Sequence, residues 1–167
     1  LARRLRRLAV RRPIAVVPTG VELPAQPRAG REALRARLGL SEAAVLVLGV
    51  GRLAREKAFD LLLHAFARAQ ASRPGLRLAL VGEGDEEIRL RRLADGLGIA
   101  PAITWAGGQP REALGAWYAA ADLLAFPSRS EAQGLVLLEA MAHGLPVVAV
   151  RSGAAADFVT EGVEGRL

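Results

Sequence analysis

Short apolar runs alternate along most of the chain with longer segments that have helical spacing. Residues 44–50, AVLVLGV, form a continuous apolar run, which is typical of a strand buried on both faces of a parallel sheet. In residues 57–72 the apolar positions recur three and four residues apart, as they do in an amphipathic helix. The same reading predicts further strands at 76–81, 102–105, 122–126, 146–150 and 164–167, and further helices at 31–38, 85–97, 110–121, 134–143 and 153–158.

This order of elements predicts an α/β, Rossmann-like fold. Strands that alternate with helices of about ten to fifteen residues form βαβ units around a parallel sheet, with right-handed crossovers and helices on both faces. Ligands of such sheets bind beyond the carboxyl ends of the strands. The loops to inspect for function are therefore 51–57, 82–85, 106–110, 127–134 and 151–157.

The first residues differ from the rest of the chain. Residues 1–12, LARRLRRLAVRR, predict a basic amphipathic helix that stops at Pro13, and residues 14–18 predict a short strand. A membrane-surface anchor and the last helix of a preceding domain both fit this helix, and its three leucines favour the second because they bury little area. We expect residues 1–13 to be a remnant of a preceding domain and 14–167 to be one Rossmann-like domain, cut from a longer protein and truncated at its C-terminus.

Composition narrows the functional classes. The chain has 167 residues, a net charge of +6 and no cysteine, which removes disulfides and cysteine-ligated metals and fits a cytoplasmic location. No apolar run approaches the roughly 20 residues that cross a bilayer. All the basic residues except Lys57 are arginines, which points to a coding bias, and aromatic residues are only 4% of the chain. We therefore discount nucleic-acid binding, which relies on basic grooves and stacking platforms.

The loop GRLAREK, residues 51–57, has the features of a phosphate site. Gly51 allows a sharp turn after the strand, and Arg52, Arg55 and Lys57 follow just before a helix. Cations beside a helix N-terminus suit a diphosphate, although a solvated basic loop is the plainer alternative. Lys57 is the chain's single lysine, and a compact ammonium is not interchangeable with a guanidinium at a phosphate.

A second motif overlaps this loop. Residues 49–54, GVGRLA, match the G-x-G-x-x-G/A pattern of dinucleotide-binding domains. That pattern also requires an immediate helix and an acidic residue at the end of the second strand, about 20 residues on. The region 69–71 has no acidic residue, and the first one after the second strand is Glu83. NAD binding is therefore the outside alternative.

Two glutamates flank the start of the predicted helix 134–143. Glu131 precedes it, Glu139 lies within it, and carboxylates of this kind accept hydrogen bonds from sugar hydroxyls. The amides of Gly134 and Leu135 stand at the helix N-terminus, where phosphate binds well. The neighbours of Glu139 are apolar, and a glutamate among buried residues needs a partner, which argues against an ordinary exposed helix glutamate.

The ordered set of motifs resembles one family. The chain is similar, over residues 14–167, to the C-terminal domain of GT-B-fold, family-4-type retaining glycosyltransferases. PTGVE (18–22) resembles the entry to that domain and GVEGRL (162–167) its closing stretch. The other matching stretches are GRLAREKAFD, LVGEGDEE and ITWAGGQPREALGAWYAAADLLAFPSRSEAQGLVLLEAMAHGLPVVAV.

The resemblance implies transfer of a glycosyl unit from a nucleotide-diphosphate sugar with retention of configuration. Arg52 and Lys57 would hold the diphosphate and stabilise the leaving charge, Glu139 would bind the ribose, and Glu131 would contact the donor sugar. Arg52, Lys57 and Glu131 are thus the expected catalytic residues. Residues 106–109 would border the base. The remaining donor-binding positions are Gly51, Gly82, Gly134, Leu135 and Val136.

The resemblance also sets the expected partners. No metal and no cofactor is implied, because cations and helix termini would do the electrostatic work. The acceptor, a sugar, lipid or small molecule, would bind through the missing N-terminal domain, with peripheral membrane contact if it is a lipid. An isolated donor half is expected to transfer nothing.

Some positions depart from the family pattern. Gln133 replaces an aromatic residue, the loop 153–157 lacks a glycine and a proline and has Asp157 for Glu, and Ala58 replaces a glycine. The first two changes leave the donor sugar open, and the change at Ala58 should matter little if that residue is already helical. A GT-B epimerase or phosphorylase and a non-catalytic nucleotide-binding module remain alternatives.

The histidines and tryptophans are assigned structural places. His64 is expected at the surface, and His143 at a helix C-terminus. Trp105 and Trp117 are expected in the core, with Trp105 near the base region.

Overall fold

The computed structural model describes residues 12–13, 15, 17, 20–26, 28–131 and 133–167. The predicted helix at 1–12 lies outside the described residues except for Arg12, and the predicted strand at 14–18 lies mostly outside them. Within the described part the helices and strands are α2 (Arg31–Arg37), β1 (Val45–Val50), η1 (Arg55–Lys57), α3 (Phe59–Ser72), β2 (Leu76–Val81), α4 (Glu87–Gly96), η2 (Ala100–Ala102), β3 (Ile103–Gly107), α5 (Arg111–Ala120), β4 (Leu123–Phe126), α6 (Leu135–Ala142), β5 (Val147–Ala149), α7 (Gly153–Phe158) and β6 (Gly165–Arg166).

The strands form one parallel sheet in the order β3-β2-β1-β4-β5-β6. This is the strand order of the Rossmann fold, and it confirms the predicted fold class. The order reverses between β1 and β4, so the loops that follow these two strands part from each other there. A crevice at the carboxyl end of the sheet is expected at this switch point.

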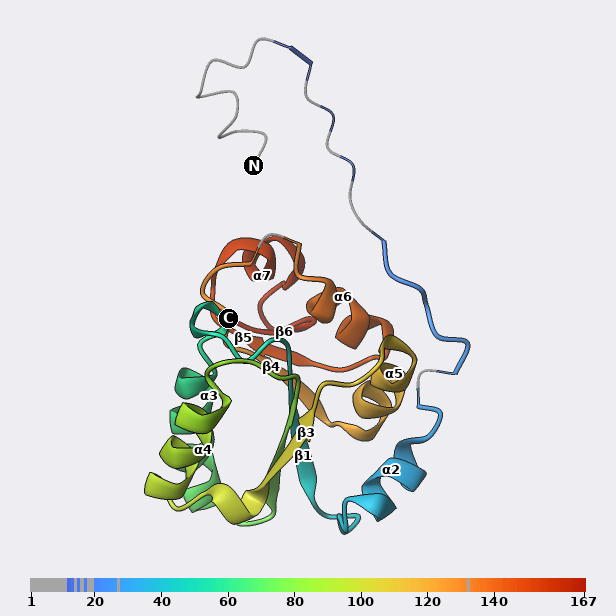
Figure 1. The fold of residues 1–167 in the computed structure, drawn as a ribbon. Helices are drawn as coiled ribbons and strands as arrows, with labels where there is room; N and C mark the ends of the chain where they lie inside the picture. The colour runs from blue at the N-terminus through green and yellow to red at the C-terminus, as the bar shows by residue number, and fades with distance from the viewer. Residues whose placement is uncertain (1–11, 14, 16, 18–19, 27, 132) are drawn as a thin grey trace.

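Helices cover both faces of the sheet, and each face has its own core (Figure 1). Helices α3 and α4 pack on one face through residues such as Phe59, Phe66 and Leu90 and meet strand residues such as Leu78 and Leu80. Helices α2, α5, α6 and α7 pack on the other face, against the intervening strand residues. The apolar runs therefore bury side chains in both directions, as their continuous pattern predicted.

An arginine cluster fixes α2 to the end of α5 and the start of β1. The buried Arg35 guanidinium donates to the carbonyls of Ala120 and Ala44 at 3.1 and 2.6 Å and pairs with Asp122 at 3.1 Å. Asp122 also accepts from the Leu46 amide at 2.8 Å and from Arg31 at 2.5 Å. Burial by itself raises the pKa of Asp122, but the Leu46 amide and the two arginines outweigh it and hold that pKa below its usual value.

We expect Asp122→Asn to lower the free energy of unfolding by about 2 kcal/mol at pH 7, because both arginines lose their counter-ion. A carboxyl whose folded pKa is depressed stabilises the fold above its unfolded pKa, near 3.9, and that contribution is lost as the pH falls through the lower folded value. Urea unfolding at pH 7 and at pH 2.5 should therefore show a smaller difference between variant and wild type in acid. The exposed Glu42→Gln is the control, and a pH-independent difference would contradict the account.

Candidate functional site

An ion pair crosses the switch point of the sheet. Lys57, at the end of η1 in the loop after β1, pairs through its Nζ with Oε2 of Glu131 in the loop after β4. Their side chains are 22% and 18% exposed, so the pair is partly shielded from water. The Arg129 amide also donates to the Glu56 carbonyl at 3.2 Å, which ties the two loops by their backbones. Two of the three predicted catalytic residues therefore meet at the predicted edge.

The backbone turn that presents Lys57 was not predicted. Ala58 lies in the left-handed region at φ 51°, between η1 and the first residue of α3, and it is the sole described residue other than glycine with a positive φ. Ala58 is therefore not helical, and the helix predicted over 57–72 begins only at Phe59. This conformation costs an L-residue roughly 1–2 kcal/mol, which explains why a glycine suits the position.

The other cations of the loop have separate partners. Arg52 is 70% exposed and pairs with Glu56 at 2.7 Å, while Arg55 is 86% exposed and lies 3.4 Å from Glu86. Each of the three cations of this loop therefore lies against a different carboxylate. An exposed pair such as Arg52–Glu56 contributes little energy, so Arg52 can exchange Glu56 for an incoming anion at small cost.

Gly82 lets the loops after β1 and β2 approach each other. Its φ is +139°, and a Cβ built on it would lie 2.0 Å from the Gly51 carbonyl oxygen. The Gly51 amide donates to the Val81 carbonyl at 2.9 Å, and the Gly82 amide donates to Gly107 at 2.8 Å. The structure therefore assigns Gly51 and Gly82 a backbone role that shapes the crevice, and their contact with a donor stays a prediction.

Helix α6 begins a few residues after Glu131, in the chain segment that follows β4. Gly134 precedes the helix at φ 65°, and a Cβ on it would meet the Ala154 Cβ of α7 at 2.7 Å. The first bonds within the helix run from the Leu137 and Leu138 amides to the Gly134 carbonyl. The amides of Leu135 and Val136 come before them, in the turn where a helix offers donors to an anion.

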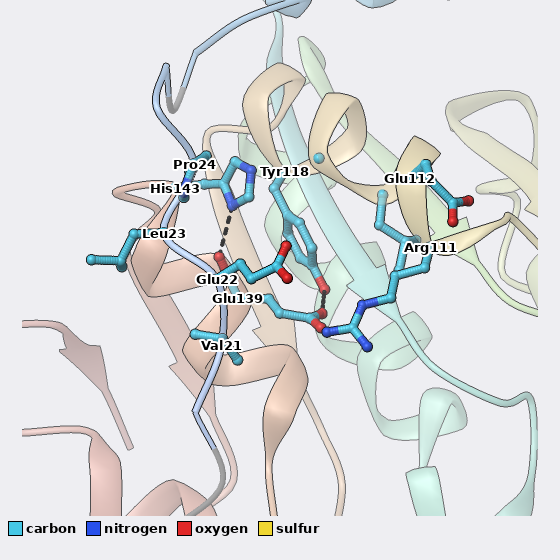
Figure 2. A pocket seen from close by; sticks show the side chains of 11 residues that line it. Val21, Glu22, Leu23, Pro24, Arg111, Glu112, Tyr118, Glu139 and His143 are labelled. Atoms are coloured by element: carbon cyan, nitrogen blue, oxygen red, sulfur yellow. Dashed lines mark hydrogen bonds between the residues drawn. The ribbon is translucent and has the colours of Figure 1, made fainter.

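Glu139 has the partner that its apolar neighbours predicted. The Tyr118 hydroxyl, on α5, donates to Glu139 Oε2 at 2.7 Å (Figure 2). Sequence reasoning missed Tyr118, although it is the only tyrosine in the chain, and its hydroxyl needs an acceptor when it is buried. Burial raises the pKa of Tyr118 further above its ordinary value, as does the Glu139 carboxylate.

A pocket of about 540 Å³ lies between α5, α6 and the segment that precedes α2. The carboxylate of Glu139 and the side chains of Arg111 and Tyr118 point into it (Figure 2). The rest of its polar lining comes from Glu22, Glu112 and His143.

The two histidines and Trp117 lie where the sequence placed them, whereas Trp105 was expected in the core and is only half-buried. His64 is exposed on α3, and His143 ends α6 with its Nδ1 2.8 Å from the Glu139 carbonyl oxygen. Trp117 is buried. Trp105 is half-buried, and the Arg91 guanidinium lies 4.7 Å from its ring centroid.

The structure places the two departures from the family pattern that concern the donor sugar. Gln133 is exposed beside Gly134, and residues 153–157 form most of α7, whose Ala154 and Ala155 are buried while Asp157 is exposed.

Within the part of the chain that the structure describes, no group of three or more His, Cys, Asp or Glu side chains could hold a metal ion. Nor does any described helix have the length and apolar character needed to span a membrane.

Comparison with known proteins agrees with this geometry. The family model for glycosyl transferases group 1 matches residues 30–167. The chain belongs to this family. It is also 41% identical over 158 residues to the D-inositol 3-phosphate glycosyltransferase of Segniliparus rotundus, a match that covers 92% of this chain and 35% of that protein.

Solved glycosyltransferases have the same fold. Sucrose-phosphate synthase from Thermosynechococcus elongatus superposes with a TM-score of 0.86 at 31% identity, covering 99% of this chain and 42% of that one. HepE of Anabaena, solved in complex with UDP, superposes with a TM-score of 0.75 at 30% identity, covering 83% of this chain and 38% of that one. This group 1 glycosyltransferase chain thus spans about a third of the length of the curated relatives it matches.

The dinucleotide alternative disagrees with the structure. Helix α3 starts at Phe59, well after Gly51, whereas the dinucleotide fingerprint needs a helix that begins at once. Gly49 is instead a packing residue, since a Cβ on it would meet Leu80 at 2.8 Å and Phe59 at 3.0 Å.

Proposed function

We propose that this chain is the donor-binding half of a retaining glycosyltransferase that uses a nucleotide-diphosphate sugar. The observation that supports it most is the Lys57–Glu131 pair at the switch point, in a chain of this family. Lys57 offers a cation to the diphosphate, and Glu131 lies beside it where a donor sugar would follow. The acceptor, a sugar, lipid or small molecule, would bind to a preceding domain, and the enzyme would work in the cytoplasm, at a membrane surface if that acceptor is a lipid.

The proposed roles follow from charge and position. As the bond from the anomeric carbon to the diphosphate breaks, negative charge grows on the leaving oxygen. Lys57, Arg52 and the amides of Leu135 and Val136 at the start of α6 stabilise that charge without a metal. Glu139, one helical turn further along, accepts hydrogen bonds from the ribose hydroxyls.

A calorimetric titration of this chain with UDP, GDP, ADP and NAD tests the donor site. We expect one nucleoside diphosphate to bind, and Glu139→Ala to weaken it roughly 10- to 100-fold because hydrogen bonds to a charged group are lost. Glu32→Ala, at an exposed position on α2, is the control and should change nothing. Tighter binding of NAD than of every diphosphate would contradict the proposal.

Glu131→Gln separates two roles of this carboxylate. Glu131 is the counter-ion of Lys57, so a diphosphate must compete with it. We expect the glutamine variant to bind the nucleoside diphosphate roughly 3- to 10-fold more tightly. In the wild type the diphosphate must replace the Glu131 carboxylate as the partner of Lys57, and losing such a pair costs about 1 kcal/mol. The full-length enzyme carrying Glu131→Gln should nevertheless lose transfer activity. Weaker binding of the diphosphate would show that Glu131 does not compete for Lys57.

A further inference from the structure

A contact between α5 and α6 holds the Glu139 side chain in place. The Tyr118 hydroxyl donates to Oε2 at 2.7 Å, so this oxygen is fixed toward α5. A carboxylate has about four acceptor positions, and Tyr118 takes one of them. The other oxygen, Oε1, and the remaining lone pair of Oε2 are left to face the pocket that the Glu139 side chain enters.

The surroundings of Tyr118 make it a rigid donor. The residue is 1% exposed, and its ring lies against the His143 ring with the centroids 5.2 Å apart. His143 donates from Nδ1 to the Glu139 carbonyl at 2.8 Å, at the end of the same helix. Residue 139 is therefore held twice, by Tyr118 at its carboxylate and by His143 at its main chain.

We propose that Tyr118 is a positioning residue for the nucleotide: it presents the Glu139 carboxylate in the orientation that accepts a ribose diol. This inference rests on the ribose-binding role proposed for Glu139. Without the hydroxyl, the glutamate would have to be ordered by the ligand itself, and immobilising one such side chain lowers affinity roughly 3- to 10-fold. Tyr118 touches no reacting atom, so its effect appears in ribose recognition.

Tyr118 keeps its proton wherever the enzyme would be studied. Burial, and then the neighbouring carboxylate, raise its pKa above the ordinary value near 10 for a tyrosine. Glu139 and His143 contact Tyr118, and the other charged side chains that line the same pocket are Glu22, Arg111 and Glu112. The hydrogen bond to Glu139 needs a protonated phenol. The effect of removing the hydroxyl should therefore be the same at pH 7 and pH 8.5.

The test is a titration cycle on this chain with UDP and 2′,3′-dideoxy-UDP, in wild type, Tyr118→Phe, Glu139→Ala and the double variant. We expect Tyr118→Phe to weaken UDP roughly 3- to 10-fold and to leave the affinity for dideoxy-UDP within about twofold. In the Glu139→Ala background the same change should have no further effect. Phe66→Leu, in the core on the opposite face of the sheet, is the control for a simple loss of stability.

The outcomes are distinguishable. Equal weakening of both ligands by Tyr118→Phe, or full additivity in the double variant, would overturn the positioning role while the donor site stands. A wild-type chain that binds UDP no more tightly than dideoxy-UDP would overturn the ribose contact of Glu139, and the inference with it.

Discussion

Lys57→Ala is expected to lower nucleoside diphosphate affinity about 100-fold and transfer by the full-length enzyme about 100- to 1000-fold. The ammonium supplies a charge-assisted hydrogen bond to the diphosphate, and its removal has a second effect. Glu131 is only 18% exposed, and without Lys57 its carboxylate would lose this counter-ion and lie beside an incoming anion. Titration with UDP and a transfer assay measure the two losses separately.

Two further variants sharpen this prediction. Lys57→Arg keeps the charge but replaces a compact ammonium by a larger, planar guanidinium. We expect this variant to retain only part of the nucleoside diphosphate affinity that Lys57→Ala loses. Arg55→Ala removes a cation from the same loop that is 86% exposed and pairs with Glu86, and it should bind as wild type does. Equal losses for Lys57→Ala and Arg55→Ala would mean that the loop acts only through its net charge.

Gly82→Ala is expected to destabilise the fold by about 3–5 kcal/mol, the sum of backbone strain and overpacking. The added Cβ would lie 2.0 Å from the Gly51 carbonyl oxygen, and φ is +139°, where L-residues are rare. Relief requires the loops after β1 and β2 to move apart. The loop that carries Arg52 and Lys57 would move with them, so urea unfolding and UDP titration should both show the loss.

Gly96→Ala is the matched control. Gly96 is the last residue of α4, and a Cβ there would meet nothing within 4 Å. Alanine is the better helix former, so this variant should be neutral or up to about 1 kcal/mol more stable. Similar unfolding midpoints for Gly82→Ala and Gly96→Ala would contradict the close approach of the two loops.

The sheet and its binding edge could be predicted from the sequence because their signals are local. The strand at 76–81 follows the predicted bounds, and α6 lies within the predicted 134–143, since apolar periodicity and stop signals such as Gly144 mark these elements. Loops that follow parallel strands lie at the same edge of the sheet, so the sequence placed Lys57 and Glu131 at one edge. The structure shows that they pair there.

The features that the sequence did not predict are contacts between residues on different elements and one unusual backbone conformation. No sequence signal marks Ala58 as left-handed, because alanine is an ordinary helix residue. Tyr118 and Glu139 lie on different helices, so only their packing brings the hydroxyl to the carboxylate. The carboxylate that faces Arg55 was equally hidden, because Glu86 comes from the loop after the next strand.

A crystal structure of this chain with bound UDP, the nucleotide present in the HepE complex, tests the central claim most directly. We predict that Lys57 Nζ and the Leu135 amide donate to the diphosphate and that the ribose hydroxyls donate to the Glu139 carboxylate, which still accepts from Tyr118. UDP bound away from the switch point, with Lys57 still paired only to Glu131, would contradict the account.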